Sequence, residues 1–163
     1  MRSPRDDYRK KFAHEVQRIS RRLKQAGYQE PIGDPGSGLM IVIEQPVGPR
    51  ILAALTRSLE VVSLPDAYVT WAATGALLEE LLALQPSYLL TIGPGAANEI
   101  DALDYPLSRA SFEQASYGTW FTWTGSIQGL SVPSLAGALD DEKAKHKFWE
   151  KFLTLRDLSL RST

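Results

Sequence analysis

The chain has 163 residues, of which 44% are hydrophobic, enough for one domain with a sizeable core. It contains no cysteine, which excludes disulfides, thiolate zinc sites and a cysteine nucleophile. No apolar run reaches 18 residues and the first residues are charged, so we expect neither a membrane span nor a signal peptide, and we predict a cytoplasmic protein.

Basic charge is concentrated at the N-terminus. The net charge is −1, but residues 1–24 carry nine Lys or Arg and three acidic residues, a charge of +6 that leaves −7 for the rest. The segment fits two interpretations: a solvated helix packed on the acidic body, which is the commoner case, or an arm for a polyanion such as DNA. Apolar residues at spacings of 4, 4, 3 and 4 predict the helix, namely Tyr8, Phe12, Val16, Ile19 and Leu23.

Two parts follow from this pattern. Residues 1–27 form a basic N-terminal helix packed on or beside the body, and residues 28–163 form a single α/β domain. The domain opens with a loop over residues 28–38, where Pro and Gly are dense.

Strands and helices alternate along the rest of the chain. Strands separated by helices predict a three-layer α/β/α sandwich with a mainly parallel central sheet of about four strands. In chain order we expect a buried strand at Leu39–Ile43, a helix from Arg50 to Leu59, a strand region over Val61, Val62 and 67–71, a helix over 77–84, a strand at Tyr88–Ile92, a short helix from Ala96, a strand at Trp120–Thr124 and a last helix carrying Phe148, Trp149 and Phe152.

Two strand-to-helix loops carry the candidate chemistry, residues 43–49 (IEQPVGP) and 131–137 (SVPSLAG). Such loops lie together at the carboxyl ends of the strands of an open α/β sheet, where ligands bind. Glu44 is the only carboxylate in either loop, and it could act as a general base or orient a water molecule. Alternatively, it caps the following helix or pairs with Arg50.

A third strand-to-helix turn is Gly93-Pro94-Gly95. It could hold a phosphate at the N-terminus of the next helix. It lacks the full G-x-G-x-x-G spacing, and Pro94 removes a backbone donor, so we favour a tight turn. His14 and His146 lack metal-ligand spacing, and we expect no metal and no cofactor.

These motifs, in this order, resemble the uracil-DNA glycosylase superfamily. Residues 43–47 align with its first loop, of the type Gly-Glu-Ala-Pro-Gly, and Glu44 falls on the Glu. Residues 81–97 are similar to its Leu-x-x-Leu-x-Pro stretch with the strand that follows, and Val132-Pro133-Ser134 takes the place of its His-Pro-Ser motif. The resemblance covers residues 39–155 and implies a uracil-DNA glycosylase-like fold.

The chain departs from the family pattern at several positions. Ile43 replaces the first Gly of the first loop, whose second Gly is shifted to Gly48. Trp71 replaces the Asn of a Thr-Asn motif that reads the base edge, and Val132 replaces the His that stabilises the leaving uracil anion. Both changes weaken the reading of a flipped base, which needs polar contacts and stacking.

The resemblance implies a protein that binds DNA and hydrolyses the N-glycosidic bond of uracil or a damaged base. Glu44 and Gln45 would be catalytic, with Glu44 handling the water at the sugar. Ser134 would grip phosphate, and Leu135 would fill the gap that a flipped base leaves in the duplex. The residues implied in substrate and DNA binding are Pro46, Val47, Gly48, Thr70, Trp71, Val132, Pro133, Ser134 and Leu135.

Two other functions fit the same sequence. The first is a non-catalytic relative that binds nucleic acid or a protein partner, which the lost Asn and His favour. The second is a small-molecule or nucleotide-binding α/β protein that uses Gly93-Pro94-Gly95.

Overall fold

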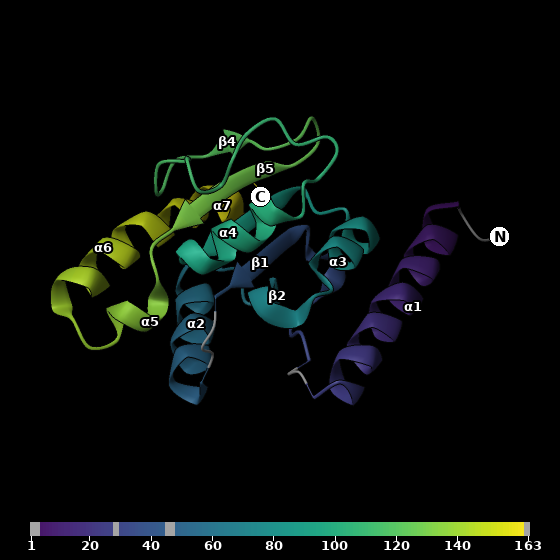
Figure 1. Cartoon of the computed structure of the whole chain (residues 1–163), viewed down its shortest axis with the longest axis horizontal. Helices are drawn as coiled ribbons and strands as arrows, with labels where there is room; N and C mark the ends of the chain where they lie inside the picture. Colours follow the sequence, from purple (N-terminus) through teal and green to yellow (C-terminus); the bar gives the residue numbers. More distant parts are fainter. Residues whose placement is uncertain (1–3, 28–29, 45–47, 162–163) are drawn as a thin grey trace.

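A computed structural model describes residues 4–27, 30–44 and 48–161, with side-chain surroundings from residue 14 to residue 158 (Figure 1). The described residues form a five-stranded sheet in the order β2-β1-β3-β5-β4. Its strands are β1 (Leu39–Ile43), β2 (Tyr68–Trp71), β3 (Tyr88–Ile92), β4 (Phe121–Thr122) and β5 (Gln128–Val132). Four of them run parallel, and only β4 is antiparallel to its neighbour β5.

The strands predicted at Leu39–Ile43 and Tyr88–Ile92 lie inside the sheet. All five residues of β1 are buried, as are the last four of β3. Strands of a parallel sheet that is covered on both faces read as continuous apolar runs, because each face needs apolar side chains. The prediction of a mainly parallel α/β sheet is therefore confirmed.

Helices cover both faces of this sheet, which agrees with an α/β sandwich (Figure 1). Side chains from alternate positions of β1, such as Ile41 and Met40, enter separate cores. One face packs against α2 (Pro49–Val61), α5 (Leu135–Ala138), α6 (Glu142–Phe152) and α7 (Arg156–Arg161). The other packs against α3 (Leu77–Leu84) and α4 (Pro94–Ala102).

The fourth parallel strand is not where the sequence predicted it. We expected a strand at Trp120–Thr124, but only Phe121 and Thr122 are extended there, and the strand that leads to Val132 is β5. The sequence pattern did not predict β5 because Gly129 lies in its middle, and glycine is unfavourable in strands. A Cβ at Gly129 would lie 2.6 Å from the Phe121 ring, so the glycine makes room for that ring to pack on the strand.

The strand region predicted at Val61 and Val62 is also wrong. Helix α2 continues to Val61, and the Val62 N–H still donates to the Ser58 carbonyl at 3.2 Å. Ile51, Leu55, Leu59 and Val62 are buried at helical spacing, so the packed face of α2 continues beyond the predicted end at Leu59. The second strand starts only at Tyr68.

Helix α1 (Pro4–Gln25) lies along α3 at one side of the molecule (Figure 1). Val16, Ile19 and Leu23 are buried, as the predicted apolar face requires. Exposed cations of α1 pair with acidic groups, Arg22 with Glu79 of α3 and Lys24 with Glu30 at 3.9 Å. From residue 14 to its end at Gln25, α1 is thus a helix packed on its own chain. In the part of the chain that the structure describes, no helix has the length and apolarity to cross a membrane.

Candidate functional site

Three loops meet at the carboxyl edge of the sheet, because β1, β3 and β5 are parallel neighbours. Glu44 follows β1, Gly93 follows β3 and Pro133 follows β5. Backbone hydrogen bonds join them, since the Glu44 N–H donates to the Ile92 carbonyl at 3.1 Å and the Gly93 N–H donates to the Val132 carbonyl at 3.0 Å. The structure therefore brings the two loops singled out in the sequence to one edge, with the Gly93 turn between them.

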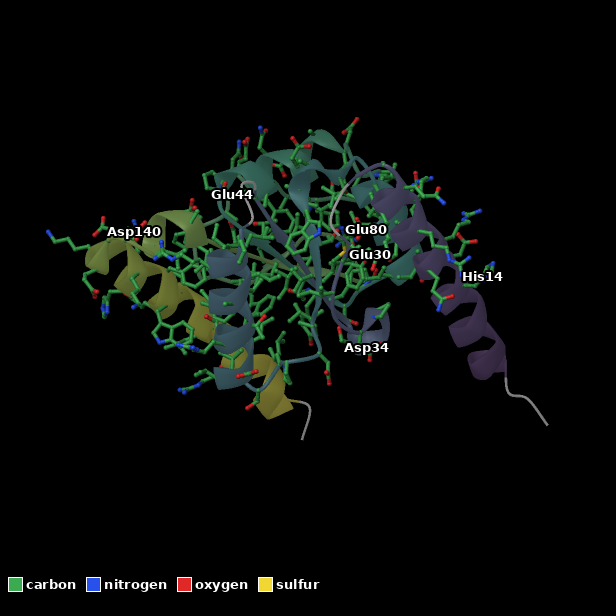
Figure 2. The ribbon with its side chains drawn as sticks, turned by 90° about the horizontal axis from the view of Figure 1, so that it is seen from below. His14, Glu30, Asp34, Glu44, Glu80 and Asp140 are labelled. Carbon is green, nitrogen blue, oxygen red and sulfur yellow. The ribbon has the colours of Figure 1, made fainter. Side chains whose placement is uncertain are left out.

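The Glu44 side chain is held at the N-terminus of α4. Its Oε2 accepts a hydrogen bond from the Gly95 N–H at 2.7 Å, and the residue is partly exposed (Figure 2). A carboxylate is stabilised there because the first N–H groups of a helix are unpaired and carry partial positive charge. Glu44 thus caps α4, and not the following helix α2 as one alternative held. The other alternative, an ion pair with Arg50, is not formed, because the Arg50 guanidinium contacts Asp140 at 3.2 Å.

The two glycines of the Gly93 turn make room for this carboxylate. Gly93 has φ of +92°, and a Cβ on it would lie 2.1 Å from the Glu44 Cδ. A Cβ on Gly95 would lie 2.9 Å from the Glu44 Oε2. The glycines therefore cradle a carboxylate of the chain itself. This occupancy argues against a nucleotide phosphate in the same place.

Three other predicted site residues lie at this edge, and three more lie outside the described residues. Pro133 and Ser134 are partly exposed, and the Ser134 hydroxyl caps α5 by accepting from the Gly137 N–H at 3.4 Å. Gly48 begins α2 and is partly exposed. Gln45, Pro46 and Val47 lie outside the described residues, so their predicted roles stay predictions.

Four predicted contact residues are buried instead. Thr70 and Val132 have no exposed surface, and Trp71 and Leu135 are 1% and 4% exposed. Leu135 packs in the core with Phe148, which is the ordinary alternative for an apolar residue at the start of a helix. The wedge role that the resemblance implies for Leu135 stays a prediction.

Glu80 is a buried polar centre that the sequence reasoning missed. It has no exposed surface, and its carboxylate accepts from the Tyr68 hydroxyl at 2.6 Å and from the Thr70 hydroxyl at 3.0 Å. Burial raises the pKa of Glu80 to about 7, although both hydrogen bonds oppose the rise. Burial and the neighbouring Glu80 also raise the pKa of Tyr68, which keeps its phenol a donor.

A signal for Glu80 was present in the helical spacing. It stands three residues after Leu77 and four before Leu84, both of which are buried, so it lies on the apolar face of α3. The cluster ties α3 to β2 in the interior (Figure 2). The two hydrogen bonds satisfy the buried carboxylate.

No protein-family model matches this chain, and no curated protein matches it. The side chains that the structure describes include no cluster of three or more His, Asp or Glu that could hold a metal ion.

Proposed function

We propose that this chain is a divergent uracil-DNA glycosylase-like protein that binds DNA and hydrolyses the N-glycosidic bond of uracil or a damaged base. The observation that supports the proposal most is the carboxylate of Glu44. It stands at the end of a central strand, partly exposed, with one oxygen fixed by the Gly95 N–H. This is the position in which the resemblance puts the group that handles the attacking water.

Hydrolysis of the N-glycosidic bond needs a carboxylate that can orient a water molecule. A carboxylate has about four lone-pair positions, so one bond to Gly95 leaves capacity to orient a water molecule. The water adds to the sugar C1′ while the bond from C1′ to the base nitrogen breaks, and the base leaves with the bonding electrons. Glu44 takes the proton that the water loses.

The reaction is expected to be slow. Val132, in place of a His, is aliphatic and buried, and it donates no hydrogen bond to the leaving anion. Loss of one donor to a developing anion typically costs about 10²–10³ in rate.

A non-catalytic DNA- or protein-binding module is the second candidate. It is favoured by the burial of Trp71 and Val132, the residues that replace the family's base-reading Asn and anion-stabilising His. Under this hypothesis Glu44 has only the structural role of capping α4.

The test uses oligonucleotides with one uracil, single- and double-stranded, followed by alkaline cleavage of abasic sites. Wild type is expected to cut slowly, and Glu44→Gln to lower the rate by about 10²-fold or more, since a general base contributes 10²–10⁴. Glu60→Gln, on the exposed side of α2, is the matched control and should cut like wild type.

Binding of the same oligonucleotides, followed by fluorescence anisotropy, separates the two candidates. Binding without cleavage would favour the non-catalytic module. Equal cleavage by wild type and Glu44→Gln would remove Glu44 from the mechanism, and absence of both binding and cleavage would refute both candidates as DNA-binding proteins.

A further inference from the structure

Helices α2, α5 and α6 enclose a groove of about 490 Å³ on the sheet face opposite to α1. Its apolar lining comes from all three helices. The apolar residues along it are Ala54, Val61, Leu135, Ala138, Leu139, Phe148 and Trp149. Small-molecule sites typically measure about 300–1,000 Å³ and are lined mainly by apolar side chains, so the size and lining suit one small ligand.

Two cations and one carboxylate line this groove. They are Arg57, Lys145 and Glu142, and all three are exposed. Among the described residues, neither Arg57 nor Lys145 has a carboxylate within ion-pair distance. Two unpaired cations beside an apolar floor complement a ligand that has an anionic group at one end of an apolar body.

The aromatic wall is held in place before any ligand arrives. Trp149 stacks on Phe152 with ring centroids 5.7 Å apart and an angle of 12° between the planes. Phe152 is itself fully buried in the core, while Val61 on the opposite wall is 48% exposed. A ligand body between these walls would cover apolar surface without having to open the fold.

We propose that the groove between α2 and α6 binds a small organic anion, a carboxylate or sulfonate on an aromatic or aliphatic body. Arg57 and Lys145 attract the acid group, and Val61, Phe148 and Trp149 contact the body. This site involves none of the residues assigned to glycosidic hydrolysis except Leu135, whose buried side chain forms part of its lining. The proposal therefore stands whether or not Glu44 is catalytic.

The experiment uses anilinonaphthalene sulfonate, an aromatic anion whose fluorescence rises on binding, with the stoichiometry measured by titration calorimetry. We expect one molecule bound per chain. Naphthoate should displace it at least about tenfold better than the neutral naphthalene methanol, because tenfold corresponds to roughly 1.4 kcal/mol, the scale of two exposed charge contacts together.

Variants locate the binding. Arg57→Ala combined with Lys145→Ala should weaken probe binding about tenfold, whereas Lys143→Ala with Lys147→Ala, also exposed on α6, should leave it within about twofold. Ala54→Phe should block the groove. Val61→Glu changes an exposed position and should repel the anion. It therefore tests the groove even if Ala54→Phe impairs folding.

A cooperative thermal melt of each variant shows that the probe meets a folded chain. The proposal is overturned if wild type does not bind the probe, if the two alanine pairs weaken binding equally, or if naphthoate and naphthalene methanol compete equally.

Discussion

Glu44 and Glu80 show two ways in which this fold accommodates a carboxylate (Figure 2). Glu44 is partly exposed at the end of β1 and accepts a backbone N–H at the start of a helix. Glu80 is fully buried and accepts two side-chain hydroxyls from β2. The hydrogen-bond partner of Glu44 is a backbone N–H, whereas the partners of Glu80 are side-chain hydroxyls.

The two environments give the carboxylates of Glu44 and Glu80 different properties. A carboxylate at a helix terminus keeps contact with water and can take part in chemistry. A carboxylate taken out of water favours its proton, because desolvation penalises the charged form. Glu44 is therefore the candidate for a reaction, and Glu80 is the candidate for a pH-dependent contribution to folding.

The largest effect is expected where backbone geometry makes room for Glu44. Gly93→Ala should lower the free energy of unfolding by about 3 kcal/mol, because φ of +92° strains an alanine and its Cβ would overlap the Glu44 side chain. Urea denaturation measures the loss. Gly137→Ala is the matched control: with no atom within 4 Å of a Cβ, it should change stability by less than about 1 kcal/mol.

A double variant tests whether the overlap is with Glu44. Glu44→Ala removes the side-chain atoms that a Cβ at Gly93 would meet, but leaves the strained φ. The Gly93→Ala loss should therefore be smaller in the Glu44→Ala background. An unchanged loss would mean that the cradle is not built around this carboxylate.

The next effect concerns Glu80 and depends on pH. Its folded-state pKa is raised from 4.5 to about 7, so the carboxyl is protonated in both states at low pH. As the pH rises, the unfolded chain ionises first, and the folded state loses relative stability until the pH passes the folded pKa. We expect stability to be about 2 kcal/mol lower near pH 8 than near pH 5 on account of Glu80.

Glu80→Gln isolates this contribution, because an amide keeps the size and does not titrate. Urea denaturation of wild type and variant across the same pH range should give curves that diverge above pH 5, with the flatter one belonging to the variant. Parallel curves would show that burial does not perturb Glu80.

The smallest effect is the cap itself. Glu44→Ala should lower the free energy of unfolding by about 1 kcal/mol, the usual value of a helix-capping side chain. Thermal denaturation of Glu44→Ala beside Asp141→Ala, which removes the side-chain cap of α6, compares two caps of the same protein. A Glu44→Ala variant as stable as wild type would leave Glu44 without a structural reason for its place.

Sequence patterns predicted apolar strands better than the strand that contains a glycine. Leu39–Ile43 is a continuous apolar run and Tyr88–Ile92 is apolar except for Thr91, a pattern typical of doubly covered strands, and both are inner strands. The run at Gln128–Val132 was missed because Gly129 lowers strand propensity, and its compensation is a ring from another segment. Such a compensation depends on tertiary contacts that no local pattern contains.

The candidate site was predicted by topology and not by its contacts. Parallel strands send Glu44 and Ser134 to one edge, and this follows from the order of strands and helices. The bond from Glu44 to Gly95 spans 51 residues and requires β1 and β3 to be neighbours. Trp71 and Leu135 sit next to polar loops, where sequence alone does not distinguish an inward from an outward side chain.

The two edges of the sheet affect whether the protein aggregates at high concentration. Beyond β2, Ile32 forms a single antiparallel bridge with Val69, with backbone hydrogen bonds of 3.0 and 2.8 Å. At the other end β4 is two residues long. An open strand of several residues invites pairing between molecules and leads to aggregation. The described sheet ends in short segments that offer little backbone to a second molecule, so its parallel strands pair within one chain.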